Sequence, residues 1–273
     1  MPIDLIALDL DDTLLRADLT ISDRNIAALR AASARGVRIV LASGRNIHSM
    51  RRYAEQLDAA GPGEYLICAN GAEIVETDTC RVLYSRIIDG PLCLEIAAAI
   101  RARGFPWQVY ENGRIRTTRG NFWADEDSRL TGQPCLPFGP GEEEELLARG
   151  QIKFVIPGEP ERIRVLHAEM SALLAGRAEV FTSKPYFLEI LAEGVDKGAA
   201  LSRLCAVLGL DVGRTLAAGD AMNDLGMLRA AGLGCAPSNA IPEAKLAAGF
   251  VSGLTNEEDF VAEIVERFVL AAT

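Results

Sequence analysis

The sequence is short of positive charge and of long uncharged stretches. Its 273 residues include 28 Lys and Arg against 38 Asp and Glu, which gives a formal net charge of −10. Because duplex nucleic acid is bound through clustered Lys and Arg, this balance argues against a nucleic-acid partner. The longest charge-free stretch, 230–242, contains two prolines and is shorter than the roughly 20 apolar residues that span a bilayer. We therefore expect no membrane helix.

Cysteine pairs and histidine clusters are also absent. None of the six cysteines forms a Cys-x-x-Cys motif, which in a chain of this length indicates reduced, mostly buried thiols and a cytoplasmic protein. The segment Met1–Asp4 shows no basic region followed by an apolar core, so no secretory signal is expected. The two histidines, His48 and His167, cannot supply a three-histidine zinc site, and His167 is expected to be structural within an amphipathic helix.

Apolar runs and helical periodicity alternate at the beginning of the chain. The sequence predicts strands at 3–10, 37–42 and 65–69, with one helix between Ser22 and Gly36 and another at 46–57. This alternation is typical of a parallel α/β sheet. The dipeptide Asn70–Gly71 lies between two extended runs and predicts a hairpin.

The pattern changes in the middle of the chain. From about residue 85 it predicts a helix through 93–100, short strands around 111–113, an irregular stretch at 131–141, a helix from 142, a strand at 152–156 and a helix through 163–173. Alternation resumes with a helix at 201–208, a strand at 215–218, a short helix near 223 and a final helix through 261–268. The predicted fold class is α/β: a Rossmann-like parallel-sheet core (1–84 and 187–273) with helices on both faces, plus an inserted α+β domain (85–186).

Three carboxylates follow the first predicted strand. Asp9, Asp11 and Asp12 repel one another unless a cation or a phosphate-linked metal lies among them. Alternation places Asp9 and Asp11 on the same side of an extended chain, at the strand end where parallel sheets bind ligands. One carboxylate is suited to bind Mg²⁺ or attack phosphorus and its neighbour to move protons. The alternative is an acidic surface loop in which Asp forms the turn.

A second acidic cluster follows another predicted strand. Gly219–Asp224 contains Asp220 and Asp224, whose oxygen atoms are ligands of the kind that hard cations prefer. The alternative is an N-capped helix, with Asp220 or Asn223 as the cap. Two such clusters at strand ends favour a shared site.

These segments resemble the four motifs of the haloacid dehalogenase-like phosphohydrolases. Asp9–Leu14 is similar to the first motif, Ser43 within Leu41–Arg45 to the second, Lys197 in Asp196–Gly198 to the third, and Gly219–Asp224 to the fourth. Asn70–Ala72 and an insertion between the second and third motifs resemble the Cof-type, subclass IIB branch. Position 12 departs from the pattern, because many members carry Gly there and Asp12 adds negative charge beside the site.

The resemblance implies a Mg²⁺-dependent phosphatase that hydrolyses small phosphorylated metabolites, such as sugar phosphates, through an aspartyl-phosphate. Asp9 would be the nucleophile and Asp11 the general acid and base. The implied metal residues are Asp9, Asp11 (through its backbone carbonyl), Asp220 and Asp224. The implied phosphate- or substrate-binding residues are Thr13, Ser43, Gly44, Arg45, Asn70, Lys197 and Asn223, with Ser43 and Lys197 also catalytic. The insertion would be a cap that excludes water and reads the leaving group.

Several of these residues have simpler interpretations. Ser43 is equally suited to cap the following helix, Lys197 to lie exposed in a first helical turn, and Thr13 to bond within its own turn. Arg45 would contact a substrate oxygen or brace the acidic cluster. Within the insertion, a group of aromatic and basic residues would contact a sugar or phosphate, or simply form a solvated strand face; these are Trp107, Tyr110, Arg114 and Arg116.

Two other functions fit part of the motif set. A phosphosugar mutase would use the same nucleophile but return the phosphate to the sugar. A receiver-like domain would accept a phosphoryl group on Asp without turnover, but the chain is much longer than such a domain and the insertion would have no role in it. The physiological substrate and the oligomeric state are not predicted by these patterns.

Overall fold

The first apolar run of the sequence forms the central strand of a large sheet. In the computed structural model, which describes residues 2–271, β1 (Leu5–Leu8) pairs in parallel with β2 (Arg38–Ala42) on one side and β12 (Thr215–Ala218) on the other. All four residues of β1 are buried, which explains why its sequence is continuously apolar rather than alternating. The eight strands follow the order β14-β13-β12-β1-β2-β3-β4-β5.

Both edges of this sheet are built from short strands. The remaining strands are β3 (Tyr65–Cys68), β4 (Glu73–Glu76), β5 (Val82–Ser85), β13 (Leu233–Ala236) and β14 (Phe250–Val251). β3 and β4 are antiparallel and joined through Asn70–Gly71, so the predicted hairpin is confirmed. Its connection contains a 3-10 turn (Ala69–Gly71) instead of a two-residue turn.

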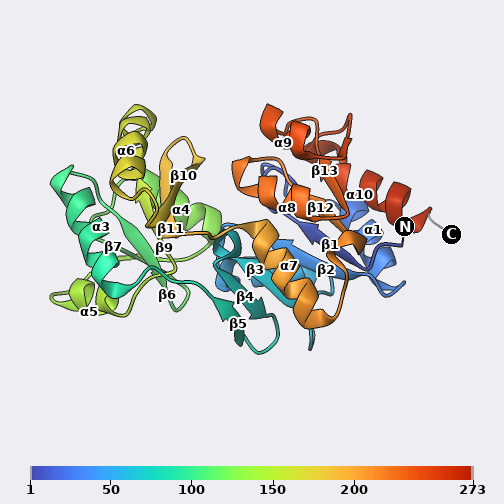
Figure 1. Cartoon of the computed structure of the whole chain (residues 1–273), viewed down its shortest axis with the longest axis horizontal. Coiled ribbons are helices and arrows are strands. Elements are labelled where there is room, and N and C mark those ends of the chain that lie inside the picture. Colours follow the sequence, from blue (N-terminus) through green and yellow to red (C-terminus); the bar gives the residue numbers. More distant parts are fainter. Residues whose placement is uncertain (1, 272–273) are drawn as a thin grey trace. The chain divides into compact units, whose positions relative to one another are not determined.

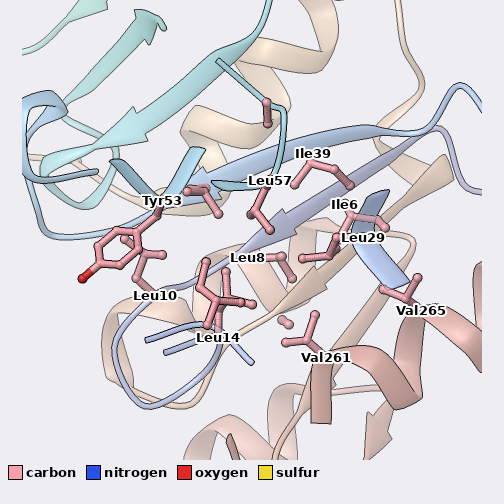
Figure 2. Close-up of a cluster of buried hydrophobic side chains, with 14 of the residues drawn as sticks. Ile6, Leu8, Leu10, Leu14, Leu29, Ile39, Tyr53, Leu57, Val261 and Val265 are labelled. Carbon is pink, nitrogen blue, oxygen red and sulfur yellow. The ribbon is translucent and has the colours of Figure 1, made fainter. Parts of the chain in front are cut away.

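Helices cover both faces of this sheet. They are α1 (Asp23–Ser33), α2 (Ile47–Gln56), α7 (Lys197–Leu208), α8 (Leu225–Ala230), α9 (Pro242–Ala247) and α10 (Phe260–Val265). Ile6 and Leu8 pack with side chains of α1, α2 and α10, as Figure 2 shows for part of this cluster. Leu5 and Ala7 point to the other face and pack with side chains of α7 and α8.

The chain divides into two compact units. One contains the chain up to Tyr84 and from Asp196 onward, and the other is Ser85–Val195 (Figure 1). The second unit has its own six-stranded sheet, in the order β10-β11-β9-β6-β7-β8. The predicted α/β fold class, with a mostly parallel sheet and a separate α+β insertion, is confirmed. Within residues 2–271, no helix combines the length and apolar character needed to cross a membrane.

The sheet of the second unit is mostly antiparallel, and side chains of three of its four helices pack against one face. Its strands are β6 (Gln108–Glu111), β7 (Arg114–Thr117), β8 (Cys135–Pro137), β9 (Lys153–Pro157), β10 (Ala178–Lys184) and β11 (Phe187–Ala192). Its helices are α3 (Gly90–Ala102), α4 (Phe122–Thr131), α5 (Glu142–Ala148) and α6 (Pro160–Leu173). Trp107, Phe154 and Ile156 pack with side chains of α3 and α6 to form the apolar core.

Four features of the second unit differ from the prediction. The stretch 131–141 contains β8, and both α4 and β10 were absent from the expected elements. None of these has a clean apolar period, since most residues of β10 are half-buried and α4 begins with an exposed Phe122. The predicted domain boundary, with the first unit resuming at residue 187, is also wrong. Strand β11 is hydrogen-bonded between β9 and β10, so it belongs to the second unit, and the boundary follows Val195.

Helices α7 and α8 approach so closely that only glycine fits at Gly198. A Cβ atom there would lie 2.2 Å from the carbonyl oxygen of Gly226. We predict that Gly198→Ala lowers the free energy of unfolding by about 1–3 kcal/mol, measured by urea denaturation, because the helices must separate. Gly253→Ala is the matched control, since its Cβ would meet no atom within 4 Å. If Gly198→Ala is as stable as the control, the close approach of the two helices is contradicted.

Candidate active site

The two acidic clusters meet at adjacent strand ends of the first unit. Leu8 of β1 lies beside Ala218 of β12, and the backbone N–H of Asp9 donates to the Ala218 carbonyl at 3.0 Å. Asp9, Asp220 and Asp224 are all buried, and one carboxylate oxygen from each lies within 4.8 Å of the others. The expected convergence of residues about two hundred positions apart in sequence is therefore confirmed.

Lys197 ties these carboxylates together. It is the first residue of α7, whose N-cap is Asp196, and it is fully buried. Its Nζ donates to Asp9 Oδ1 at 2.6 Å and to Asp224 Oδ1 at 2.7 Å. The interpretation of Lys197 as an exposed first-turn residue is therefore wrong.

The electrostatics of this cluster are dominated by burial. Burial raises the pKa of Asp9 well above its ordinary value, and Asp224 adds to the rise, while Lys197 opposes it. Burial and the neighbouring Asp224 raise the pKa of Asp220 to about 7. Burial alone would lower the pKa of Lys197, but the charges of Asp224 and Asp9 outweigh it and the pKa rises. Three carboxylates face one ammonium, so a divalent cation with oxygen ligands fits the donor set and its charge.

Asp224 has both of its carboxylate oxygens engaged by the protein. Oδ1 accepts from Lys197, and Oδ2 accepts from the backbone N–H groups of Asp220 and Ala221 at 3.0 Å each. These bonds join the two ends of the loop that follows β12, and they hold the backbone of Asp220 in place. Asp224 is therefore placed to orient the site, and a direct metal bond from it would compete with these three donors.

Asp11 and Arg45 form a bidentate ion pair. Arg45 Nε donates to Asp11 Oδ2 at 2.8 Å, and Nη2 donates to Oδ1 at 2.6 Å. The guanidinium is buried, whereas Asp11 is half-buried. Burial opposes the charge on Arg45, but the hydrogen bonds and charge of Asp11 prevail and raise its pKa. Of the two interpretations of Arg45, the structure supports the one in which Arg45 holds a carboxylate of the acidic cluster.

Thr13 and Ser43 do not have the simple roles considered for them. Thr13 Oγ1 donates to Asp220 Oδ1 at 2.6 Å, across 207 residues of sequence, and so orients a carboxylate of the cluster. Ser43 follows β2, and its Oγ accepts from the backbone N–H of Arg45 at 3.3 Å. The cap of α2 is Asn46, whose side chain accepts from the Ser49 N–H, so the helix-cap interpretation of Ser43 is wrong.

Asn70 and Asn223 lie next to each other beside this cluster. Asn223 Nδ2 donates to Asn70 Oδ1 at 2.9 Å, and the Asn70 backbone N–H donates to the Ser43 carbonyl at 2.9 Å. Gly44 lies against the same amide, which would be 3.2 Å from a Cβ at that position. The predicted phosphate-binding residues Ser43, Gly44, Asn70 and Asn223 are thus brought together.

The position of Asp12 is explained by its backbone. Asp12 adopts a left-handed conformation with φ of 63°, which glycine and Asp tolerate better than most residues. Its carbonyl accepts from Asn239 Nδ2 at 2.8 Å, and its side chain is exposed. The extra negative charge therefore lies at the surface of the loop.

Two asparagines that the motifs do not include hold the loop that carries Asp11. Asn239 bonds the Asp12 carbonyl and accepts from the backbone N–H of Asn256 at 3.1 Å. Asn256 Nδ2 in turn donates to the Leu15 carbonyl at 2.8 Å. This chain of bonds fixes both sides of the turn after β1. Isolated Asn residues are so common in turns that no sequence signal distinguishes these two.

The candidate residues of the insertion have structural partners. Trp107 is fully buried and packs against Phe138 and Phe154, so it is a core residue and its interpretation as a ligand contact is wrong. Arg116 pairs with Glu111 at 3.0 Å and also with Glu142. Tyr110 donates to Asp127 Oδ2 at 2.7 Å. His167 lies 3.2 Å from the Val180 carbonyl, which agrees with a structural role.

The raised pKa of Asp220 predicts a pH-dependent stability in EDTA-treated protein. Both folded and unfolded forms are protonated below the ordinary pKa of 3.8, and the unfolded form loses its proton first as pH rises. The free energy of unfolding should therefore fall between about pH 4 and 7 and level off above the folded pKa. Asp220→Asn should reduce this slope, measured by urea denaturation across the pH range, and Asp23→Asn at an exposed position should leave it intact. An unchanged slope in Asp220→Asn would contradict the assignment.

Comparisons with known proteins agree with the motifs. A family model described as haloacid dehalogenase-like hydrolase matches residues 6–265. A 5-amino-6-(5-phospho-D-ribitylamino)uracil phosphatase of Bacillus subtilis is 30% identical over 270 residues, which cover 98% of this chain and 96% of that protein. A haloacid dehalogenase-like hydrolase from Bacteroides thetaiotaomicron has a solved structure that is 30% identical, with a TM-score of 0.89 over 97% of this chain and 99% of that one.

A further solved structure shares the fold. It is described as a subclass IIB sugar phosphatase, is 23% identical and matches with a TM-score of 0.79 over 97% of this chain and 98% of that one, so it supports the shared fold. The family match spans the acidic strand ends, Lys197 and the insertion alike. The chain therefore belongs to the haloacid dehalogenase-like hydrolases.

Proposed function

We propose that this protein is a Mg²⁺-dependent phosphatase that hydrolyses small phosphorylated metabolites through an aspartyl-phosphate on Asp9. The observation that carries the proposal is the buried Lys197, which bonds Asp9 and Asp224 while Asp220 lies within the same 4.8 Å cluster. Phosphate esters repel anionic nucleophiles, so a nucleophile of this kind needs fixed positive charge beside it.

Asp9 would attack phosphorus with the oxygen that does not bond Lys197. Lys197 occupies Oδ1, and within residues 2–271 Oδ2 has no hydrogen-bond donor. The new bond joins that oxygen to phosphorus as the ester P–O bond breaks, and Asp11 gives a proton to the leaving alkoxide. In the second half, Asp11 takes a proton from water, the water oxygen bonds to phosphorus, and the Asp9–phosphorus bond breaks to release inorganic phosphate.

The residues that would hold Mg²⁺ are the side chains of Asp9 and Asp220 and the backbone carbonyl of Asp11, with Asp224 orienting a bound water. The ion would supply positive charge to the phosphoryl oxygens. The excess of buried carboxylate over ammonium supports this assignment, since without a cation two carboxylates share the charge of one lysine.

Arg45 would position Asp11 for its two proton transfers. Its bidentate bonds hold the ionised carboxylate of Asp11, and the bond to the oxygen that receives the proton would open when Asp11 acts as the acid. A phosphoryl group would be bound by the Ser43 hydroxyl, Lys197 and the amide of Asn223. Gly44 and Asn70 would shape the space around it.

The substrate we propose is a small phosphate monoester, either a sugar phosphate or a related metabolite. Two similar proteins support this class: one is named for a phosphorylated ribitylaminouracil, and the other is described as a sugar phosphatase. The unit Ser85–Val195 would be the cap that selects the leaving group. Release of inorganic phosphate distinguishes hydrolysis from a phosphosugar mutase, which would yield a rearranged phosphate ester instead.

We predict that Asp9→Asn abolishes turnover, lowering kcat by roughly 10⁴-fold or more, because the amide is a poor nucleophile for phosphorus. Lys197 keeps its bond to Asp224, so circular dichroism should show a folded protein. Phosphate release from a panel of sugar phosphates and nucleotides is the measurement, and Asp18→Asn is the matched control. Activity retained in Asp9→Asn would exclude Asp9 as the nucleophile.

Removal of the metal should stop the reaction and destabilise the protein. EDTA should abolish phosphate release, and added Mg²⁺ should restore it. Because binding stabilises only the folded form, Mg²⁺ at a hundred times its Kd should add about 2.7 kcal/mol to the free energy of unfolding. Thermal melts with and without Mg²⁺ measure this, and Asp220→Asn should lose most of the shift. Full activity in EDTA would reject the metal requirement.

A further inference from the structure

Tyr53 of α2 has a buried ring and a hydroxyl that reaches the loop after β1. The residue is 1% exposed and packs in the apolar cluster that includes Leu10 and Leu14. In Figure 2 its hydroxyl oxygen points out of this cluster. The hydroxyl donates to the backbone carbonyl of Leu19 at 3.2 Å and accepts from Arg52 Nη2 at 2.6 Å. Phenylalanine would fill the same apolar space, so packing alone does not account for the hydroxyl.

The carbonyl that Tyr53 binds belongs to a turn beside Asp11. Leu19 has a left-handed backbone with φ of 64°, which a bulky residue rarely adopts. Its N–H donates to the Arg16 carbonyl at 2.9 Å. Leu15, just before this turn, forms a parallel bridge with Asp11, so the turn lies against the start of the loop. A strained turn persists only where its surroundings hold it, and the bond from Tyr53 is one such support.

The ring of Tyr53 faces Arg45, the partner of Asp11. The guanidinium carbon of Arg45 lies 5.9 Å from the ring centroid, which is just within the range of a cation–π attraction. Arg45 is buried, and this attraction is stronger for a cation that has lost its water. Tyr53 therefore contacts Arg45 through its ring and the loop that carries Asp11 through its hydroxyl.

The loop after β1 is held from two directions. On one side Asn256 Nδ2 donates to the Leu15 carbonyl at 2.8 Å, which attaches the loop to the segment before α10. On the other side Tyr53 attaches it to α2, the helix that begins two residues after Arg45. The bond from Tyr53 thus joins the element that carries Asp11 to the element that follows Arg45. It is placed to fix the distance between these two side chains.

We propose that Tyr53 is a positioning residue that keeps Asp11 and Arg45 in register for proton transfer, and this inference rests on the proposed phosphatase function. In the first half of the reaction, Asp11 gives its proton to the leaving alkoxide as the ester P–O bond breaks. While Asp11 carries that proton, one of its two bonds from Arg45 is open. The direction of the carboxyl group then depends on the loop. Tyr53 acts on this step by limiting the movement of the loop, without contact to the substrate.

The test removes the hydroxyl and compares two esters that differ in their need for an acid. The p-nitrophenolate ion leaves without a proton, whereas the alkoxide of ribose 5-phosphate requires one. General acid catalysis contributes roughly 10²- to 10⁴-fold, and a misdirected Asp11 loses part of it, so Tyr53→Phe should lower kcat/KM for ribose 5-phosphate roughly 10-fold. It should leave kcat/KM for p-nitrophenyl phosphate within about 2-fold, since the bond-breaking step of that ester needs no acid.

Tyr84→Phe is the matched control. Tyr84 of β5 belongs to the same unit and also faces an arginine, with the guanidinium carbon of Arg203 4.2 Å from its ring centroid. Within the part of the chain that the structure describes, its hydroxyl makes no hydrogen bond, so this substitution should leave both esters unchanged. Thermal melts compare the folding of the two variants. A merely structural role of Tyr53 would lower kcat/KM for both esters by the same factor.

Arg45→Lys gives a second, independent readout. Lysine keeps the charge but not the fork that bonds both oxygens of Asp11, so the same selective loss for ribose 5-phosphate is expected. Residues that act through one contact are not additive, so the double variant with Tyr53→Phe should lose no more than the larger single loss.

The outcomes separate this inference from the proposed function. A selective loss for ribose 5-phosphate in Tyr53→Phe that does not add to that of Arg45→Lys supports the positioning role. Equal losses for both esters, no loss, or losses that multiply in the double variant overturn the role of Tyr53 and leave the phosphatase intact. No phosphate release from either ester by the native chain rejects the phosphatase, and this inference with it.

Discussion

A single buried ammonium group holds the first unit's chemistry together. Lys197 bonds carboxylates that follow β1 and β12, and it does so from the first turn of α7, so three distant parts of the chain must meet around one charge. Removing it would leave two buried carboxylates without their cation, a far greater cost than the loss of an exposed ion pair. The strand register, the close packing of α7 on α8 and the loop closed by Asp224 all serve to bring these groups within bonding distance.

Much of the first unit could be predicted from the sequence because its signals are strong and local. β1 and β12 are wholly buried, so their apolar runs are continuous, and Ser22 and Asn46 cap their helices through ordinary side-chain bonds. The acidic strand ends could be recognised because neighbouring carboxylates repel one another unless a cation lies among them. The second unit was harder to predict, since β10 is half-buried on both faces and α4 presents an exposed ring where an apolar stripe would be expected.

The meeting of the two acidic clusters could be predicted, but the hydrogen-bond partners of individual side chains far apart in sequence could not. The Arg45 side chain is equally compatible with a substrate oxygen and with Asp11, and only the fold decides between them. Three hydrogen bonds join positions more than two hundred residues apart: Thr13 to Asp220, Asn239 to Asp12 and Asn256 to Leu15. The bond between Asn239 and Asn256 is shorter in sequence and links the last two of these. Motifs predict which groups react, whereas these bonds determine how well the groups are held.

The pairing of β1 with β12 sets a condition on when the protein can become active during its synthesis. Leu5 meets Thr215 across the sheet, and the loop with Asp220 and Asp224 comes later still. The emerging chain can form the part of the sheet from β1 to β4 early. One edge of β1 then has no partner strand until β12, in the last quarter of the polypeptide, has been synthesised. A half-made chain thus carries Asp9 without Lys197, so the proposed phosphoryl chemistry has to await the later part of the chain.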